Sequence, residues 1–383
     1  MRLSIVTSAL VAALVGFGST IALIISAAQA VGASPDETAS WVTALCLAMA
    51  GTSAYLSLRH RLPIITAWST PGAALIGASA GVTLPSAVGA FLVAGVLIVL
   101  AALFRPVGAL IERIPGPVAD AMLAGIVLRF VVGVFESAGT APAFVLPLVG
   151  LFLLVRLFNP ALAVLAVLAA GLAAAFGFGL AGPLPDGLAL SGLTLVTPAF
   201  EPAALIGLGV PLFLVTMASQ NLPGFAVLRG SGYERVPTRS ILAVTGLASI
   251  LSAFFGAHTS NLAAISAALC TGPDTHPDAS KRWLTGPFYA LAYLAMAAFG
   301  ATLIGVITAL PPELIRTVAG LGLIGALSGA LTTAMAEESR RFAAVLTFAV
   351  TASGLSLFGI GSAFWGLVAG LVAVGLDRAR SRF

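Results

Sequence analysis

The chain has 383 residues, of which 59% are hydrophobic and only 8% are charged, and its formal net charge is +4. A soluble domain carries about 25% charged residues, so this composition excludes a water-soluble globular protein. The few basic residues are spread over predicted loops, so no nucleic-acid partner is expected. The lipid bilayer is the expected surrounding.

Apolar blocks of about 20 residues, the length that crosses a bilayer as a helix, follow one another along the chain. They lack the alternation of a membrane β-barrel, so the sequence predicts an all-α polytopic membrane protein with fourteen transmembrane segments. The first seven segments cover residues 3–30, 38–57, 63–80, 85–104, 118–138, 142–158 and 160–181. The second seven cover residues 203–224, 238–256, 258–271, 283–305, 311–333, 341–358 and 360–377.

The basic residues orient these segments. An even number of segments places both termini on one side, and the positive-inside rule makes that side cytoplasmic. All but two of the 18 Lys and Arg residues fall there. They are Arg2, Arg59, Arg61, Arg105, Arg113, Arg156, Arg229, Arg235, Arg239, Lys281, Arg282, Arg340, Arg341, Arg378, Arg380 and Arg382. The exceptions are Arg129, within a segment, and Arg316, in an opposite loop.

The third segment contains a break, because Trp68 is followed by Ser69, Thr70, Pro71 and Gly72. Proline lacks an amide donor and glycine adds backbone freedom, so a continuous helix is disfavoured. A half-helix that starts inside the membrane leaves N–H groups without partners and favours an anion there. Ser and Thr are typical N-cap residues of such a start. We therefore predict these five residues to bind substrate.

The tenth segment has a similar break. At a constant offset, Trp68 aligns with His258, and the hydroxyl pair that follows it aligns with Thr259 and Ser260, before Asn261. Thr259, Ser260 and Asn261 are therefore predicted as N-cap residues and substrate ligands of a second half-helix. The alternative is that the hydroxyls bond to helix carbonyls and only kink ordinary helices.

A second match supports an internal repeat. At nearly the same offset, GPVADAMLAGI (116–126) aligns with PPELIRTVAGL (311–321), which joins the fifth segment to the twelfth. Seven is an odd number, so two repeats, residues 1–182 and 198–383, would be inverted across the membrane. Inverted repeats with interrupted helices in corresponding positions are typical of secondary transporters.

Other polar residues lie in apolar segments. Gln220 and Asn221 in the eighth segment are predicted to contact substrate or, alternatively, to hold helices together. Arg129 and Glu136 share a helix face. Either they pair with each other, or the arginine side chain extends to the membrane surface, or the arginine attracts an anion. His258 titrates near neutral pH or caps a helix. Arg129, Glu136 and His258 are the candidates for proton coupling.

The sequence offers no catalytic motif in its required context. G-x-S-x-G at 77–81 and G-x-G-x-x-G at 320–325 lack the strand–turn–helix setting that gives these patterns meaning. We predict no enzymatic activity, no cofactor and no metal site.

Three stretches carry a resemblance to a known family: TAWSTPGAAL (66–75), PLFLVTMASQN (211–221) and VTASGLSLFGIGSAFWGLVAG (350–370). They resemble the BenE-type benzoate:proton symporters of bacteria. That family is similar in fold to nucleobase and sulfate transporters. The resemblance implies a core domain of segments 1–4 and 8–11 and a gate domain of segments 5–7 and 12–14. It also implies a location in the bacterial inner (plasma) membrane, and it allows a homodimer.

The resemblance further implies import of benzoate or a similar aromatic carboxylate by proton symport with alternating access. The two half-helix starts would hold the carboxylate, and Trp68, Phe17 or Phe213 would contact the ring. Nucleobase relatives carry an acidic residue near the site in segment 8, where this chain has Gln220. The alternative hypotheses are a carrier of another anion or nucleobase, and a passive channel.

Overall fold

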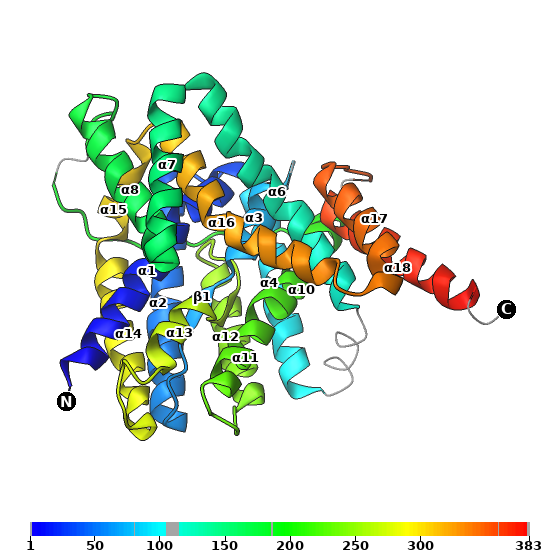
Figure 1. Cartoon of the computed structure of the whole chain (residues 1–383), viewed down its shortest axis with the longest axis horizontal. Helices are drawn as coiled ribbons and strands as arrows, with labels where there is room; N and C mark the ends of the chain where they lie inside the picture. The colour runs from blue at the N-terminus through cyan, green and yellow to red at the C-terminus, as the bar shows by residue number, and fades with distance from the viewer. Residues whose placement is uncertain (1, 80, 105–114, 185–186, 359, 381–383) are drawn as a thin grey trace.

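The computed structural model describes residues 2–79, 81–104, 115–184, 187–358 and 360–380 (Figure 1). These residues are mostly helical, and they include one pair of short strands. Arg105, Arg113 and Arg382, three of the arginines predicted on the cytoplasmic side, lie outside the described residues.

The elements of the first half follow the predicted segments closely. They are α1 (Leu3–Ala30), α2 (Pro35–His60), β1 (Thr66–Trp68), α3 (Thr70–Gly77), α4 (Leu84–Leu103), α6 (Gly116–Thr140), α7 (Pro142–Phe158) and α8 (Pro160–Gly177).

The second half is more broken. It comprises α9 (Pro202–Ala204), the π-helical turn η1 (Leu205–Gly209), α10 (Val210–Thr216), the π-helical turn η2 (Met217–Asn221), α11 (Leu222–Gly230), α12 (Thr238–Ala253), β2 (Ser260–Leu262), α13 (Ile265–Thr271), η3 (Ala279–Leu284), α14 (Thr285–Ala298), α15 (Gly300–Thr308), α16 (Pro312–Ala334), η4 (Glu338–Arg340), α17 (Arg341–Ala352) and α18 (Ser362–Arg380).

Local sequence sets the helix ends. At the start of α2, the Ser34 side chain accepts from the backbone N–H of Glu37, whose carboxylate accepts from the N–H of Ser34. This capping box, with Pro35 in the first turn, satisfies N–H groups that have no partner within the helix. At the other end, Arg61 adopts a left-handed conformation with φ 54°, which stops the helix.

The lengths of the helices agree with a polytopic membrane protein. Among the described residues, seven helical stretches are long and apolar enough to cross a membrane. The number is eight if Ala279–Ala298 and Gly300–Thr308, which meet at 63°, form one bent span. Each of the fourteen predicted segments contains a described helix, but several are short, and α3 and α13 have only eight and seven residues. The number fourteen therefore stays a prediction.

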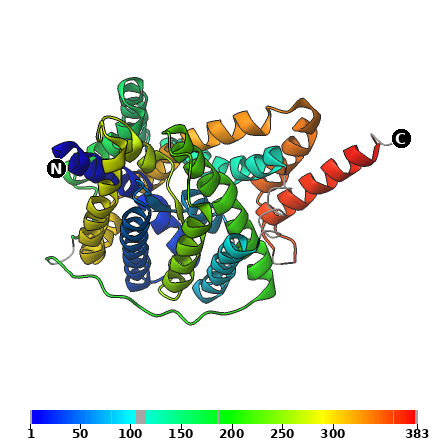
Figure 2. The ribbon, with the colours of Figure 1, turned by 90° about the horizontal axis from the view of Figure 1, so that it is seen from below.

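Helices from the two halves of the chain pack together. In the part of the molecule on the left and centre of Figure 1, α2 packs against α14, and α4 against α12. Along the top and right of that view, α6 packs against α16 and α17. The last helix, α18, packs against α17 and then projects away from the rest (Figures 1 and 2).

An extended connection, residues 187–201, runs across one face of the molecule between the two halves (Figure 2). Its backbone is held by helices of both halves. Thr194 N–H donates to Ser40 Oγ on α2 (2.8 Å), and Val196 N–H donates to the carbonyl of Phe254 (2.8 Å). A long segment without secondary structure is thus kept in a defined path.

The close approach of α6 and α16 can be tested at Gly320. A Cβ there would collide with the carbonyl of Phe130 and with Val134 on α6. Gly325 lies on the same helix, and a Cβ there would meet no atom of the described residues within 4 Å. We expect Gly320→Ala to cost about 1–3 kcal/mol through overpacking, and Gly325→Ala to be neutral or stabilising. Thermal unfolding of the two variants in detergent measures this, and equal melting temperatures would contradict the packing.

Candidate functional site

The two predicted breaks meet each other inside the molecule. β1 and β2 pair in antiparallel register, with Thr66 opposite Leu262 and Trp68 opposite Ser260. The ladder continues at both ends through Ser69 N–H to the carbonyl of Thr259 (3.0 Å) and through the N–H of Ala263 to the carbonyl of Ile65 (2.9 Å). Each strand leads into a short helix, α3 or α13, so the backbone groups freed by the breaks bond to one another.

Residues of the first break form the start of α3. Ser69 is its N-cap residue, and its Oγ accepts from the N–H of Gly72 (3.1 Å). Thr70 is the first helical residue and is half-buried, whereas Pro71 and Gly72 are buried. A Cβ at Gly72 would lie 2.6 Å from Leu212 Cδ1, so the missing side chain lets α3 pack directly on α10.

The second break differs from the prediction. α13 begins at Ile265, its N-cap residue is Ala264, and no side chain caps it. The prediction that Thr259, Ser260 and Asn261 are N-cap residues is therefore wrong. The reason is that Ser260 and Asn261 belong to β2 and are held extended by the ladder to β1, with Thr259 directly before it. All three are nevertheless fully buried beside the first break.

A hydroxyl on α10 joins the two breaks. Thr216 Oγ1 donates to Ser69 Oγ (3.1 Å) and lies 2.8 Å from Thr259 Oγ1. The three residues are fully buried, so their hydroxyls bond to one another and not to water. Thr216 was not among the predicted site residues, although a hydroxyl in the apolar stretch PLFLVTMASQN was a signal for it.

His258 is fixed in its neutral form by two hydrogen bonds. The indole N–H of Trp41 donates to its Nδ1 (3.1 Å), and an indole nitrogen can only donate. Nδ1 is therefore unprotonated, and Nε2 carries the hydrogen that bonds to the carbonyl of Ser69 (3.0 Å). A second proton on the ring would break the bond from Trp41. The arrangement explains a structural role and does not favour the predicted proton coupling, which stays untested.

The two side-chain amides of the eighth segment, Gln220 and Asn221, differ in their surroundings. Asn221 Oδ1 accepts from the N–H of Leu262 (2.9 Å) and thereby anchors β2. Gln220 is half-buried, and its amide bonds to none of the described residues. Both lie in η2, a π-helical turn of the kind that often occurs at functional sites. The sequence analysis did not predict this turn, because one extra residue in a turn does not change the pattern of a continuously apolar stretch.

Three unsatisfied polar atoms lie on η2 and on β2, which pack against each other. Among the described residues, Ser219 Oγ, Ser260 Oγ and Asn261 Oδ1 are buried and have no hydrogen-bond partner. A buried polar group left unpaired costs about 1–3 kcal/mol, so each of these atoms needs a partner such as an ordered water or a polar ligand. Ser219 was not among the predicted site residues.

Aromatic rings lie on one face of the strand pair. Trp68 stands directly opposite Ser260 in the ladder, so their side chains share a face. The Trp68 ring contacts those of Phe17 and Tyr293 edge-on, with centroids 5.8 Å apart in both pairs. Its indole N–H donates to Thr20 Oγ1 (2.9 Å). The face therefore combines an aromatic wall with the unpaired hydroxyl of Ser260.

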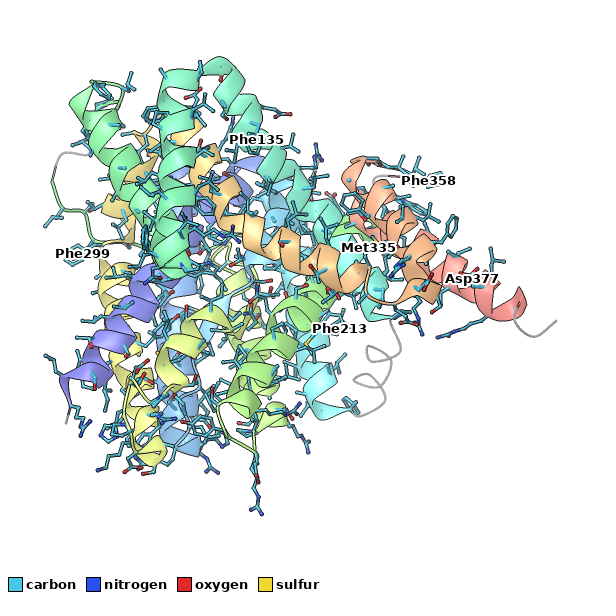
Figure 3. The ribbon with its side chains drawn as sticks, in the orientation of Figure 1. Phe135, Phe213, Phe299, Met335, Phe358 and Asp377 are labelled. Carbon is cyan, nitrogen blue, oxygen red and sulfur yellow. The ribbon has the colours of Figure 1, made fainter. Side chains whose placement is uncertain are left out.

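Three further predicted residues lie outside that cluster. Phe213 is buried on α10 (Figure 3). Arg129 and Glu136 lie on α6, and both are exposed. They do not form an ion pair, so the alternative that they pair with each other is wrong. A separation of seven residues places them about 10 Å apart along the helix, which is too far for direct contact.

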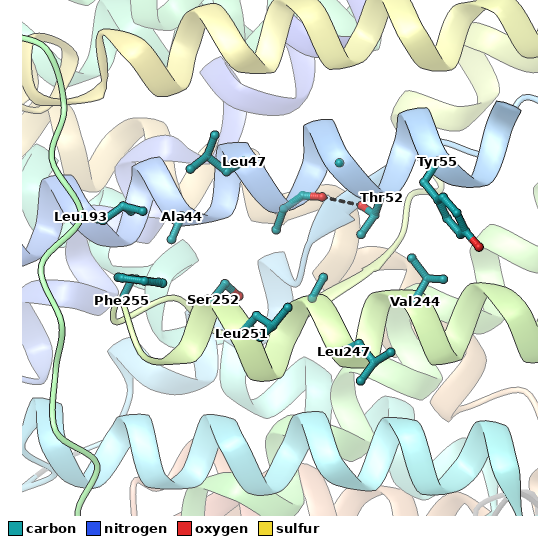
Figure 4. A pocket seen from close by; sticks show the side chains of 13 residues that line it. Ala44, Leu47, Thr52, Tyr55, Leu193, Val244, Leu247, Leu251, Ser252 and Phe255 are labelled. Atoms are coloured by element: carbon teal, nitrogen blue, oxygen red, sulfur yellow. Dashed lines mark hydrogen bonds between the residues drawn. The ribbon is translucent and has the colours of Figure 1, made fainter. Parts of the chain in front are cut away.

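A cavity of about 530 Å³ opens between α2 and α12 (Figure 4). Its lining is mostly apolar, with exposed Leu47, Leu247 and Leu251 at its mouth. Thr52 also lines it, but the Thr52 hydroxyl is already bonded to the carbonyl of Ala48 (2.6 Å). Tyr55 lines it as well, and the Tyr55 hydroxyl bonds to none of the described residues. No residue of β2 lines this cavity, so it is separate from the unpaired hydroxyl of Ser260.

Comparison with known proteins gives a consistent result. The family model described as benzoate membrane transport protein matches residues 1–376. The inner membrane protein YdcO of Escherichia coli (strain K12) is 39% identical over 97% of this chain and 96% of its own length. The benzoate membrane transport protein of Acinetobacter baylyi (strain ATCC 33305 / BD413 / ADP1) is 34% identical over 97% of this chain and 94% of its own length.

Solved structures share the fold at low identity. A structure of SLC26A9 has a TM-score of 0.68 and 14% identity, and it covers 98% of this chain, which spans 65% of that chain. The transmembrane domain of the cyanobacterium bicarbonate transporter BicA has a TM-score of 0.59 and 13% identity, covering 97% of this chain and 98% of its own. The likeness establishes a helical membrane fold of this type.

The hydroxyl bridge at Thr216 can be tested by thermal unfolding in detergent. Thr216→Val leaves the hydroxyls of Ser69 and Thr259 without their shared partner, so we expect a loss of about 1–3 kcal/mol. The matched control is Thr245→Val on α12, because the equally buried Thr245 hydroxyl bonds only to carbonyls of its own helix. A Thr216→Val variant as stable as the Thr245→Val variant would disprove the bridge.

Proposed function

The chain belongs to the benzoate membrane transport (BenE) family and is a membrane transporter, and from this premise we propose that it imports benzoate or a similar aromatic carboxylate. The family and the fold neighbours are transporters and not enzymes. The proposed mode is secondary active transport by proton symport with alternating access. The proposed location is the inner membrane, as in the name of the Escherichia coli relative.

The observation that carries this proposal is the shared face of β1 and β2. Benzoate is a flat apolar ring with one carboxylate, and this face presents an aromatic ring, Trp68, directly opposite the unpaired hydroxyl of Ser260. Offset or edge-on ring contacts suit the apolar part of such a substrate. Phe17 lies against Trp68 on the same side and extends the aromatic wall.

Neutral donors are proposed to bind the carboxylate. Thr70 at the start of α3 and Ser219 and Gln220 in η2 are half-buried. Ser260 is fully buried on β2, which packs against η2. The first N–H groups of α3 add the positive end of a helix dipole. Neutral donors suit a site that must also release its ligand, because a buried fixed charge would bind an anion tightly and would be costly when empty.

The contacts between helices support a seven-plus-seven inverted repeat. If α3 corresponds to α13 and α1 to α9–α11, the packing of α2 on α14 corresponds to that of α12 on α4. The contacts of α7 with α8 and of α17 with α18 correspond in the same way. We propose residues 1–182 and 198–383 as the repeats, with segments 1–4 and 8–11 as the core and segments 5–7 and 12–14 as the gate.

Proton coupling, cytoplasmic termini and a homodimer remain parts of the proposal. Symport is supported by the resemblance to BenE-type symporters. Arg129 and Glu136 lie on α6, away from the hydroxyls of β2, and His258 is committed to two bonds in its neutral form. None of these three residues therefore has surroundings that favour a moving proton.

Uptake by purified protein in proteoliposomes tests the function directly. Under an inward proton gradient we expect radiolabelled benzoate to accumulate, and a protonophore should abolish the accumulation. Equilibration without accumulation would indicate a passive channel. Competition by bicarbonate, sulfate or uracil that exceeds competition by unlabelled benzoate would favour a carrier of another anion or a nucleobase.

Ser260→Ala tests the site. The Ser260 hydroxyl has no protein partner among the described residues, so its removal should leave the melting temperature unchanged. If it binds the carboxylate, we expect KM for benzoate to rise about tenfold, the value of one hydrogen bond to a charged group. Ser26→Ala is the control, because that hydroxyl bonds to the carbonyl of Ala22 on its own helix. A Ser260→Ala variant with wild-type KM would contradict the site.

A further inference from the structure

Arg129 is a charged residue without an assigned partner. It lies in the middle of α6, a 25-residue helix that is long and apolar enough to cross a membrane. No carboxylate of the described residues lies within ion-pair distance of it. A charged side chain at such a depth is costly and usually marks a functional site.

The Arg129 side chain lines a small cavity of about 20 Å³, enough for one water-sized polar group, between α3, α6 and the start of α18. Of the lining residues, all within the described part of the chain, Arg129 is the one that carries a charge. Ser79, just beyond the end of α3, and Gly361 and Ser362, at the start of α18, line the same cavity. The cavity thus lies where elements of the proposed core and gate domains meet.

The start of α18 also favours a negative ligand there. α18 has 19 residues, and the N–H groups of its first turn have no acceptors within the helix and point towards its start, where Gly361 and Ser362 line the cavity. Thr351 also lines the cavity, but its hydroxyl lies against Gly366 of α18, which is not a lining residue. A cation and a helix N-terminus therefore border one small space.

The backbone beside Arg129 leaves room for its side chain. Gly354 has φ +69°, and a Cβ there would lie 3.1 Å from Nη1 of Arg129. A larger residue would be strained at this φ and would press on the guanidinium group. The turn after α17 thus leaves space for the guanidinium group beside the cavity.

We propose that Arg129, with the start of α18, forms a second anion-binding station that receives the carboxylate substrate before it reaches β1 and β2. The station rests on the proposed function. It lies at the far end of α3 from Ser69, and eight helical residues separate the two positions by about 12 Å. With cytoplasmic termini, that end of α3 faces outward, so the station lies on the import path.

Kinetics and binding of Arg129 variants test the station. We expect Arg129→Gln to raise KM for benzoate uptake at least about tenfold with a much smaller change in kcat, because a charge-assisted hydrogen bond is lost. Arg129→Lys keeps the charge and should stay within about threefold of wild type. Arg316→Gln, at an exposed arginine that does not line the cavity, is the control and should leave KM unchanged.

Binding measured without transport separates the two proposals. The benzoate concentration that half-maximally raises the melting temperature should increase at least about tenfold in Arg129→Gln and stay near wild type in Arg129→Lys. If wild type binds and transports benzoate but Arg129→Gln has the same KM and the same half-maximal concentration, the station is wrong and the proposed function stands. If wild type neither binds nor transports benzoate, both are wrong.

Discussion

The structure depends on one constraint: backbone polar groups in the interior of a membrane protein must find partners within the protein. Breaking the helix within two predicted membrane segments frees such groups, and the antiparallel pairing of β1 with β2 lets the backbone of each break bond to that of the other. Asn221 and Ser249 extend this solution, since their side chains bond to the backbone of Leu262 and Ser260. Irregular backbone is thereby stable in the interior of the protein.

The same constraint divides the polar side chains into two groups. The first group already forms hydrogen bonds that join the two breaks, and it comprises Ser69, Thr216, Thr259 and His258. Among the described residues, the side chains of Ser219, Ser260 and Gln220 have no hydrogen-bond partner, and these are the groups that a carboxylate can use. The proposed substrate site therefore has no fixed charge, whereas the small cavity beside α3 is lined by the charged Arg129. Neutral binding in the centre and attraction at the entrance suit an anion that must both enter and leave.

The breaks were predictable because Ser69-Thr70-Pro71-Gly72 and Thr259-Ser260-Asn261 oppose a helix through their own local chemistry. The strand pairing was not predictable, since three-residue strands have no periodicity and their partner is almost 200 positions away in the sequence. For the same reason Thr259, Ser260 and Asn261 were expected to cap a helix that begins only at Ile265. The π-helical turns and the two hydrogen bonds that fix the neutral form of His258 arise from tertiary packing, which sequence patterns do not record.

The central claim is that benzoate binds between the aromatic face of β1 and the unpaired hydroxyl of β2. The most direct measurement is a crystal structure of the protein with 4-iodobenzoate, in which the anomalous signal locates the iodine and the density locates the carboxylate. We expect the carboxylate within hydrogen-bond distance of Ser260 and the iodinated ring beside Trp68. An iodine peak only in the apolar cavity between α2 and α12, with β1 and β2 unoccupied, would contradict the claim.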